Sequence, residues 1–178
     1  TLTVSERQIL NAWVGHVWGA WLSGWGIVNG AGSDVHPLPQ AIPFDAAKAA
    51  LGERLYHDTR FSKDNSISCA SCHAFEKGGT DNLQFSVGVG GLKGGVNAPT
   101  VFNAVFNMRQ FWDGRARHLA EQAGGPPLNP VEMASKDWAE IIAKLEQDAA
   151  FKKAFTALYP EGFCEATLLM RSPSLSGG

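Results

Sequence analysis

The chain has 178 residues, of which 44% are hydrophobic and 18% are charged, and its net charge at pH 7 is −2. This length suits one domain with a short appendage, and the hydrophobic content is sufficient for a buried core. The weakly acidic balance, without a basic stripe, excludes nucleic acid as an expected partner, and three cysteines are too few for a disulfide scaffold.

Residues 1–30 differ in character from the rest of the chain. The stretch 9–28, ILNAWVGHVWGAWLSGWGIV, has no charge and four tryptophans, and it is about long enough to cross a bilayer. Small residues recur along one side at spacings of three and four, which favours close packing of helices in membranes. Glu6 ahead of the run, and the length of the run, argue against a cleaved signal peptide. We expect a Trp-rich apolar helix that anchors the chain in a membrane or binds a partner; the alternative is a soluble helix packed on the domain.

His16 lies on the small-residue side of this helix, four residues after Ala12. It could seat a planar cofactor, although a histidine on an apolar helix is more often simply hydrogen-bonded. Both interpretations stay open at this point.

Residues 31–44 are rich in glycine, serine and proline and are expected to form a linker. Asp45 then predicts the start of a helix in AAKAALGERLYHD, with Ala47, Ala50, Leu51 and Leu55 on its apolar face. We expect the main domain to cover residues 45–178, with an abbreviated C-terminal end.

The sequence Cys69-Ala70-Ser71-Cys72-His73 is the most informative motif in the chain. Two thiols at this spacing can add to the vinyl groups of a haem, and the adjacent histidine then ligates the iron. A zinc site would need further ligands, and Cys164 is distant and has no CxxC partner. A thioredoxin-like pair needs no histidine and would lie in a βαβ pattern, which is absent. The motif therefore predicts one covalent haem c, which is attached outside the bacterial cytoplasm.

The remaining sequence predicts loops and helices. Residues 77–97 form a glycine-rich loop, and Pro99 is expected to begin a helix in APTVFNAVFN. Ser135 and Asp148 are expected to cap two further helices, whose apolar residues recur at helical spacing. These apolar faces consist of Trp138, Ile141, Ile142 and Leu145, and of Phe151, Ala154, Phe155 and Leu158. Because no strand-period run appears, the predicted fold class is all-α.

Four stretches resemble the N-terminal half of bacterial dihaem cytochrome c peroxidases, including the MauG-like branch, over about residues 43–160. They are LGERLYHDTRFSKDNSISCASCH, GGTDNLQFSVGVGG, NAPTVFNAVFNMRQFWDGRARHLAEQAGGP and VEM. The resemblance implies a cytochrome c-like domain that carries the peroxidatic haem. It also implies a role for each matching position.

By that resemblance, Cys69 and Cys72 hold the haem thioethers and His73 is the proximal ligand. Glu132 matches the catalytic glutamate, Gln122 the distal glutamine, Trp112 the tryptophan between two haems, and Asn97 one ligand of an inter-domain calcium. A carboxylate in a mostly apolar pocket suits peroxide cleavage, because burial raises its pKa toward working pH. From the residues alone, Glu132 is a solvated loop residue, Gln122 a surface helix residue and Trp112 part of the core.

The sequence departs from the family pattern in three ways. Val89 stands where many members carry a second haem-ligating histidine, so the sixth iron position is expected to stay open unless Met108, Met133 or Met170 reaches it. A second CxxCH motif, for the electron-donating haem, is missing. The end, from GFCEATLL onward, is abbreviated, and calcium is in doubt because its other protein ligands would lie in the missing half.

These patterns together predict a periplasmic oxidoreductase of the cytochrome-c peroxidase type, with residues 1–30 as the candidate anchor to the inner membrane. It would reduce hydrogen peroxide to water at an open-sided haem, with electrons from a small cytochrome c, a quinol or a separate haem subunit. The alternatives are a haem c electron carrier and an accessory subunit of a membrane assembly. The residue or molecule opposite His73 on the iron distinguishes the peroxidase from the electron carrier.

Overall fold

Helix α3 (Ala46–Tyr56) begins at Asp45, as the sequence predicts, and is the first element of the computed structural model, which describes residues 44–169. The Asp45 carboxylate accepts hydrogen bonds from the backbone N–H groups of Ala47 and Lys48, at 2.9 and 3.1 Å. These bonds satisfy donors that the first turn of a helix leaves unpaired.

Two different parts of the molecule pack against α3. Leu51 and Leu55 belong to the main hydrophobic core, whereas Ala49 and Tyr56 pack against Cys69 and its neighbours. The predicted apolar face is therefore partly wrong, since Ala47 and Ala50 are exposed. Helix α3 is buried on two sides, one against the main core and one against the Cys69 segment. The apolar periodicity of the helix alone did not predict the second contact.

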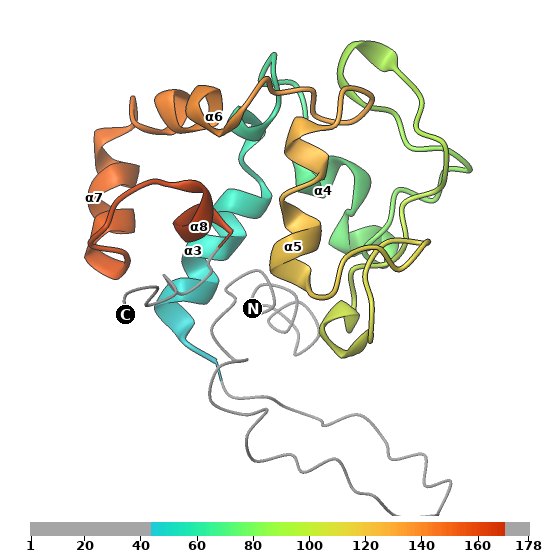
Figure 1. Ribbon diagram of the computed structural model, residues 1–178, viewed down its shortest axis with the longest axis horizontal. Helices are drawn as coiled ribbons and strands as arrows, with labels where there is room; N and C mark the ends of the chain where they lie inside the picture. The colour runs from blue at the N-terminus through green and yellow to red at the C-terminus, as the bar shows by residue number, and fades with distance from the viewer. Residues whose placement is uncertain (1–43, 170–178) are drawn as a thin grey trace, which may run out of the picture.

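The main core lies between α3 and three later helices, α6 (Trp138–Leu145), α7 (Ala149–Leu158) and α8 (Glu165–Leu168). Figure 1 shows these four helices gathered on one side of the described domain. The apolar side chains of these helices that are 0% exposed are Leu55, Ile141, Leu145, Phe151, Phe155 and Leu168. Burial of each such side chain contributes about 1.5–3 kcal/mol to folding.

The predicted cap of α7 is confirmed and that of α6 is wrong. Asp148 accepts a hydrogen bond from the Phe151 N–H at 2.8 Å and begins α7. Helix α6 is capped by Asp137 rather than Ser135. The Ser135 hydroxyl instead donates to the Phe61 carbonyl at 2.9 Å, a bond to a residue 74 positions away.

The other side of the domain consists of loops and single turns, with α4 (Cys69–Cys72) and α5 (Leu119–Ala123) between the two sides (Figure 1). The single 3-10 turns are η1 (Thr59–Phe61), η2 (Phe75–Lys77), η3 (Val89–Gly91), η4 (Ala104–Phe106) and η5 (Pro126–Leu128). Residues 44–169 contain isolated β-bridges but no strand. The described part is therefore all-α, as predicted.

The helix expected from Pro99 does not form. The Ala98 carbonyl accepts from the Thr80 hydroxyl, and the Pro99 carbonyl lies 3.1 Å from a ring nitrogen of His73. These carbonyls bond to side chains of another segment rather than to N–H groups four residues ahead, as a helix would require. Only the short turn η4 follows.

The expected helix over 1–30, nearly all of the linker over 31–44, and Met170 lie outside the described residues. Within residues 44–169, the longest apolar helices are too short to cross a lipid bilayer.

Candidate functional site

The CASCH segment forms a single helical turn. Helix α4 holds Cys69 and Cys72 three residues apart, so both thiols lie on one side of the turn, and neither forms a disulfide. Burial raises the pKa of Cys69 to about 12 and also raises that of Cys72. A redox-active CxxC pair needs the opposite shift, toward thiolate. These thiols therefore lack the thiolate character that disulfide exchange requires.

His73 follows α4 and is oriented by two backbone carbonyls. Its Nδ1 lies 3.2 Å from the Gly79 oxygen and 3.1 Å from the Pro99 oxygen. Because carbonyls only accept, Nδ1 must carry the proton, which leaves Nε2 as a free electron-pair donor. Burial lowers the His73 pKa and so favours the neutral ring. This is the arrangement of a metal-ligating histidine, whose other nitrogen donates to a fixed oxygen.

Tyr56 ties α3 to this ligand. Its hydroxyl donates to the His73 carbonyl at 2.6 Å, and its ring stacks on Phe75 with 4.9 Å between centroids. Burial raises the pKa of the Tyr56 hydroxyl, so it stays protonated and remains a donor. The histidine is thus held through its ring and through its backbone.

Glu132 comes from the turn that follows η5 and is close enough to the CASCH segment to interact electrostatically with both thiols. Burial, with a smaller contribution from the Glu132 carboxylate, raises the pKa of both Cys69 and Cys72. Glu132 is half-buried, and its Oε1 accepts a hydrogen bond from the Asn129 side chain at 2.7 Å. Burial raises the Glu132 pKa, and the Asn129 bond and the Arg115 charge oppose that rise. Glu132 is therefore not the solvated loop residue that the residues alone suggested.

The loop that carries Val89 contacts the Glu132 backbone directly. The Val89 N–H donates to the Glu132 carbonyl at 2.8 Å. At Gly88 a Cβ atom would lie only 2.2 Å from the Val131 oxygen and 2.5 Å from the Glu132 oxygen. Only glycine permits this approach, so the loop residue Val89 is joined to the segment that carries the candidate acid–base residue Glu132.

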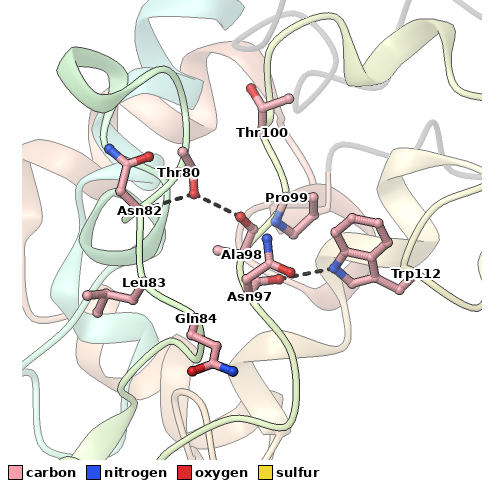
Figure 2. Close-up of a pocket in the computed structure, with 9 residues that line it drawn as sticks. All are labelled: Thr80, Asn82, Leu83, Gln84, Asn97, Ala98, Pro99, Thr100 and Trp112. Atoms are coloured by element: carbon pink, nitrogen blue, oxygen red, sulfur yellow. Dashed lines mark hydrogen bonds between the residues drawn. The ribbon is translucent and has the colours of Figure 1, made fainter.

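Of the other predicted site residues, Gln122 lies in one part of the domain, and Trp112 and Asn97 lie together in another. Gln122 is half-buried in α5, which leads through η5 to the Glu132 turn. Trp112 is 63% exposed, so the interpretation of this residue as core is wrong. Its indole N–H donates to the Asn97 carbonyl at 3.0 Å, as Figure 2 shows.

Trp112 and Asn97 line an open hollow of about 580 Å³. Figure 2 shows that Thr80, residues 82–84 and residues 97–100 also line it. These segments follow Gly79 and include Pro99, whose carbonyls face His73. Glu132 and Gln122 do not line it. The hollow is therefore a surface feature on the His73 side and not the site of the Glu132 carboxylate.

Two of the three methionines considered as iron ligands, Met108 and Met133, lie among the described residues. Met133 is 4% exposed and belongs to the main core, and Met108 is 92% exposed. Among residues 44–169, no group of three or more His, Cys, Asp or Glu side chains gathers as a metal site. A calcium site at Asn97 therefore stays a prediction.

Sequence reasoning missed three residues of this region. Tyr56 and Asn129 make the hydrogen bonds described above, and the Arg115 guanidinium lies over the Phe111 ring, 3.4 Å from its centroid. The spacing Asn129-x-x-Glu132 could have been noticed, because a short polar side chain three residues before a glutamate often closes a local turn. Nothing local in the sequence points to Tyr56 or Arg115.

A free imidazole nitrogen, two thiols on one turn and a nearby half-buried carboxylate fit a covalently attached haem. The fold and the site together define an all-α, haem c-binding domain of the cytochrome c type.

Comparison with known proteins agrees with this class. The family model for di-haem cytochrome c peroxidase matches residues 46–172. The chain is 63% identical over 129 residues to the cytochrome c peroxidase Ccp of Escherichia coli (strain K12), covering 72% of this chain and 28% of that protein. It is 47% identical over 131 residues to the cytochrome c551 peroxidase of Nitrosomonas europaea, covering 72% of this chain and 39% of the relative.

A crystal structure of a MauG-like protein associated with microbial copper homeostasis superposes with a TM-score of 0.65 and 30% identity, covering 82% of this chain and 44% of that one. The chain belongs to the di-haem cytochrome c peroxidase family, whose cofactor is haem c. It spans between about a quarter and two fifths of the length of the two curated relatives named here.

Proposed function

We propose that this domain reduces hydrogen peroxide at a haem c attached through Cys69 and Cys72 and ligated by His73. The observation that carries the proposal is Glu132, a half-buried carboxylate with a raised pKa beside the attachment turn. The names of the relatives, cytochrome c peroxidase and cytochrome c551 peroxidase, support the same chemistry.

The haem iron would supply the binding position for peroxide and the electrons that cleave its O–O bond. Cleavage also requires a proton to move from the inner to the outer peroxide oxygen, and a positioned carboxylate is suited to that transfer. Glu132 would accept the first proton as a base and return it as an acid. Gln122 would orient the peroxide through its side-chain amide.

His73 would be the protein ligand of the haem iron. Its Nε2 is the free nitrogen, because Nδ1 donates to the carbonyls of Gly79 and Pro99. Val89 has no ligating atom, so the peroxide side would stay accessible without a preceding change of ligand. The burial of Met133 in the core disfavours the alternative of a six-coordinate electron carrier.

Electrons would come from a small cytochrome c, a quinol or a separate haem-bearing subunit or domain. Trp112, exposed and fixed by its bond to the Asn97 carbonyl, would lie on the surface that meets this donor. The same surface would also bind a calcium ion, with the Asn97 side chain as one of its ligands. Attachment of haem c outside the cytoplasm supports a periplasmic location, and the composition of residues 1–30 supports an anchor to a membrane or membrane protein.

The test is rapid mixing of the haem-loaded ferric protein with peroxide, followed at the Soret band, for the parent and Glu132→Gln. The variant keeps the shape of the side chain but cannot accept a proton, so the reaction should slow by about 10²–10⁴-fold, the usual effect of a lost acid–base group. Because burial raises the Glu132 pKa, the parent rate should fall as the pH drops through that pKa and the carboxylate becomes protonated.

Gln122→Ala is the matched comparison. It should slow the peroxide reaction less than Glu132→Gln does, because it removes only a group that orients the peroxide. A Glu132→Gln variant as fast as the parent would exclude Glu132 from the mechanism. A parent that does not react with peroxide would favour the electron-carrier or accessory-subunit function.

A further inference from the structure

We propose that Asn129 is the positioning residue for the Glu132 carboxylate: its side-chain N–H directs that carboxylate and holds it ready to accept a proton. The inference rests on the proposed function of Glu132 and extends it to a residue outside the CASCH, Gln122 and Glu132 set.

Both ends of the Asn129 amide are in use. Nδ2 donates to Glu132 Oε1 at 2.7 Å, and Oδ1 accepts from the Val131 backbone N–H at 3.1 Å. The Val131 N–H can only donate, so the atom facing it must be the amide oxygen. This fixes the orientation of the amide and leaves its N–H group toward Glu132.

The backbone around Asn129 is held as firmly as its side chain. Its carbonyl accepts from the N–H groups of Glu132 and Ala134, at 3.0 and 2.9 Å. Its own N–H donates to the carbonyls of Gly125 and Pro126, at 3.1 and 3.2 Å. The donor therefore belongs to a turn whose geometry leaves little freedom to the carboxylate it contacts.

Other groups around Glu132 cannot replace this directed bond. Arg115 attracts the carboxylate, but its side chain is 56% exposed and pairs with Asp113 at 2.9 Å, so solvent screens its effect. Cys69 and Cys72 carry no charge once they are thioethers. The neighbouring loop, residues 86–91, contains only uncharged side chains.

Asn129→Asp separates positioning from a merely structural role. Aspartate keeps the oxygen that accepts from Val131 but puts a second acceptor where the donor was. Asn129→Ala removes both contacts. Asn107→Asp makes the same chemical change at an exposed position and is the control.

The first readout uses the full-length, haem-loaded protein without peroxide. Infrared titration follows the protonated carboxyl band that Glu132→Gln abolishes. In Asn129→Asp the carboxyl pair should stay protonated to higher pH, with its midpoint raised by about one pH unit or more, a tenfold change in the protonation equilibrium. Asn129→Ala should shift in the same direction and Asn107→Asp should not shift.

The second readout is the pH dependence of the reaction with peroxide. Loss of the donor should move the acid limb of the rate profile upward, so that both Asn129 variants are slower than the parent at low pH and recover as the pH rises. A purely structural role predicts that Asn129→Asp behaves as the parent and only Asn129→Ala is impaired.

An unchanged infrared midpoint together with an unchanged rate profile in Asn129→Asp would overturn the proposal. If the parent does not react with peroxide, the proposed function fails, whereas the infrared titration still decides whether Asn129 controls the Glu132 carboxylate.

Discussion

At the scale of single residues, the site depends on which atoms of a side chain remain free. Nε2 of His73 is available as a ligand because Nδ1 donates to two carbonyls. The Glu132 carboxylate accepts a hydrogen bond from the Asn129 amide. Val89 is bonded to the Glu132 carbonyl through its backbone N–H. The chemistry expected of this site therefore follows from hydrogen-bond assignments as much as from residue types.

Val89 gives the sharpest prediction at this scale. The parent should show a high-spin ferric haem at rest, because valine cannot ligate iron. Val89→His should convert it to low spin, because imidazole is a strong axial ligand. Electron paramagnetic resonance and the optical spectrum of the two ferric proteins measure this difference.

Val96→His is the control, since Val96 is 57% exposed and lies in the same glycine-rich loop. It should leave the spin state unchanged. A low-spin ferric parent with a methionine-sulfur charge-transfer band would contradict the expectation of an open iron position.

At the scale of elements, the Glu132 turn is held from two sides. The Val89 loop donates to the Glu132 carbonyl, and the Lys63 N–H, next to η1, donates to the Met133 carbonyl, each at 2.8 Å. The Ser135 hydroxyl adds its bond to Phe61 within η1. The turn is thus joined both to the glycine-rich loop and to the main core.

Gly88→Ala tests the contact between the loop and the turn. Its Cβ atom would overlap the backbone oxygens of Val131 and Glu132, so the loop or the turn must move. We expect a loss of about 1–3 kcal/mol in the free energy of unfolding, the usual cost of overpacking, measured by urea denaturation. The peroxide reaction should also slow, because the Glu132 backbone is displaced.

Gly95→Ala provides the matched control. A Cβ atom at Gly95 would meet nothing within 4 Å, and its backbone does not require glycine. Equal stability of the two variants would show that the approach of Gly88 to the turn is not needed for folding.

At the scale of the whole molecule, the described domain combines a helical side with a loop side. The helical side contains the main core, and the loop side carries the carbonyls that orient His73 and the exposed Trp112. Tyr56 connects them, because it belongs to α3 and contacts the His73 backbone. Residues 44–169 therefore contain a core and the predicted haem ligand within one unit.

Deletion of residues 1–30 should leave this unit intact. We expect the truncated protein to bind haem with an unchanged spectrum and thermal unfolding midpoint, because the described core is built from residues after position 44. If residues 1–30 form an anchor, the truncated protein should also be released from membranes or from its partner, as fractionation of cells would measure. Loss of haem on truncation would instead make residues 1–30 part of the core.

The sequence by itself determined the features that depend on near neighbours in the chain. The CASCH motif predicted a haem attachment site, and Asp45 and Asp148 predicted two helix starts that the structure confirms. Thioether spacing and helix caps both involve residues within a few positions of each other. The all-α class followed from apolar periodicity without strand patterns. The four stretches that resemble dihaem cytochrome c peroxidases correctly predicted the family.

Only the tertiary structure decided which distant groups meet. Glu132 lies beside α4, Ser135 bonds to Phe61 instead of capping α6, and the Pro99 carbonyl faces His73 instead of starting a helix. The bonds of Ser135 and of the Pro99 carbonyl join residues 26 or more positions apart, so no local pattern encodes them. The physical reason is competition: a backbone or hydroxyl group bonds to the partner that packing brings within reach, and packing depends on the whole fold.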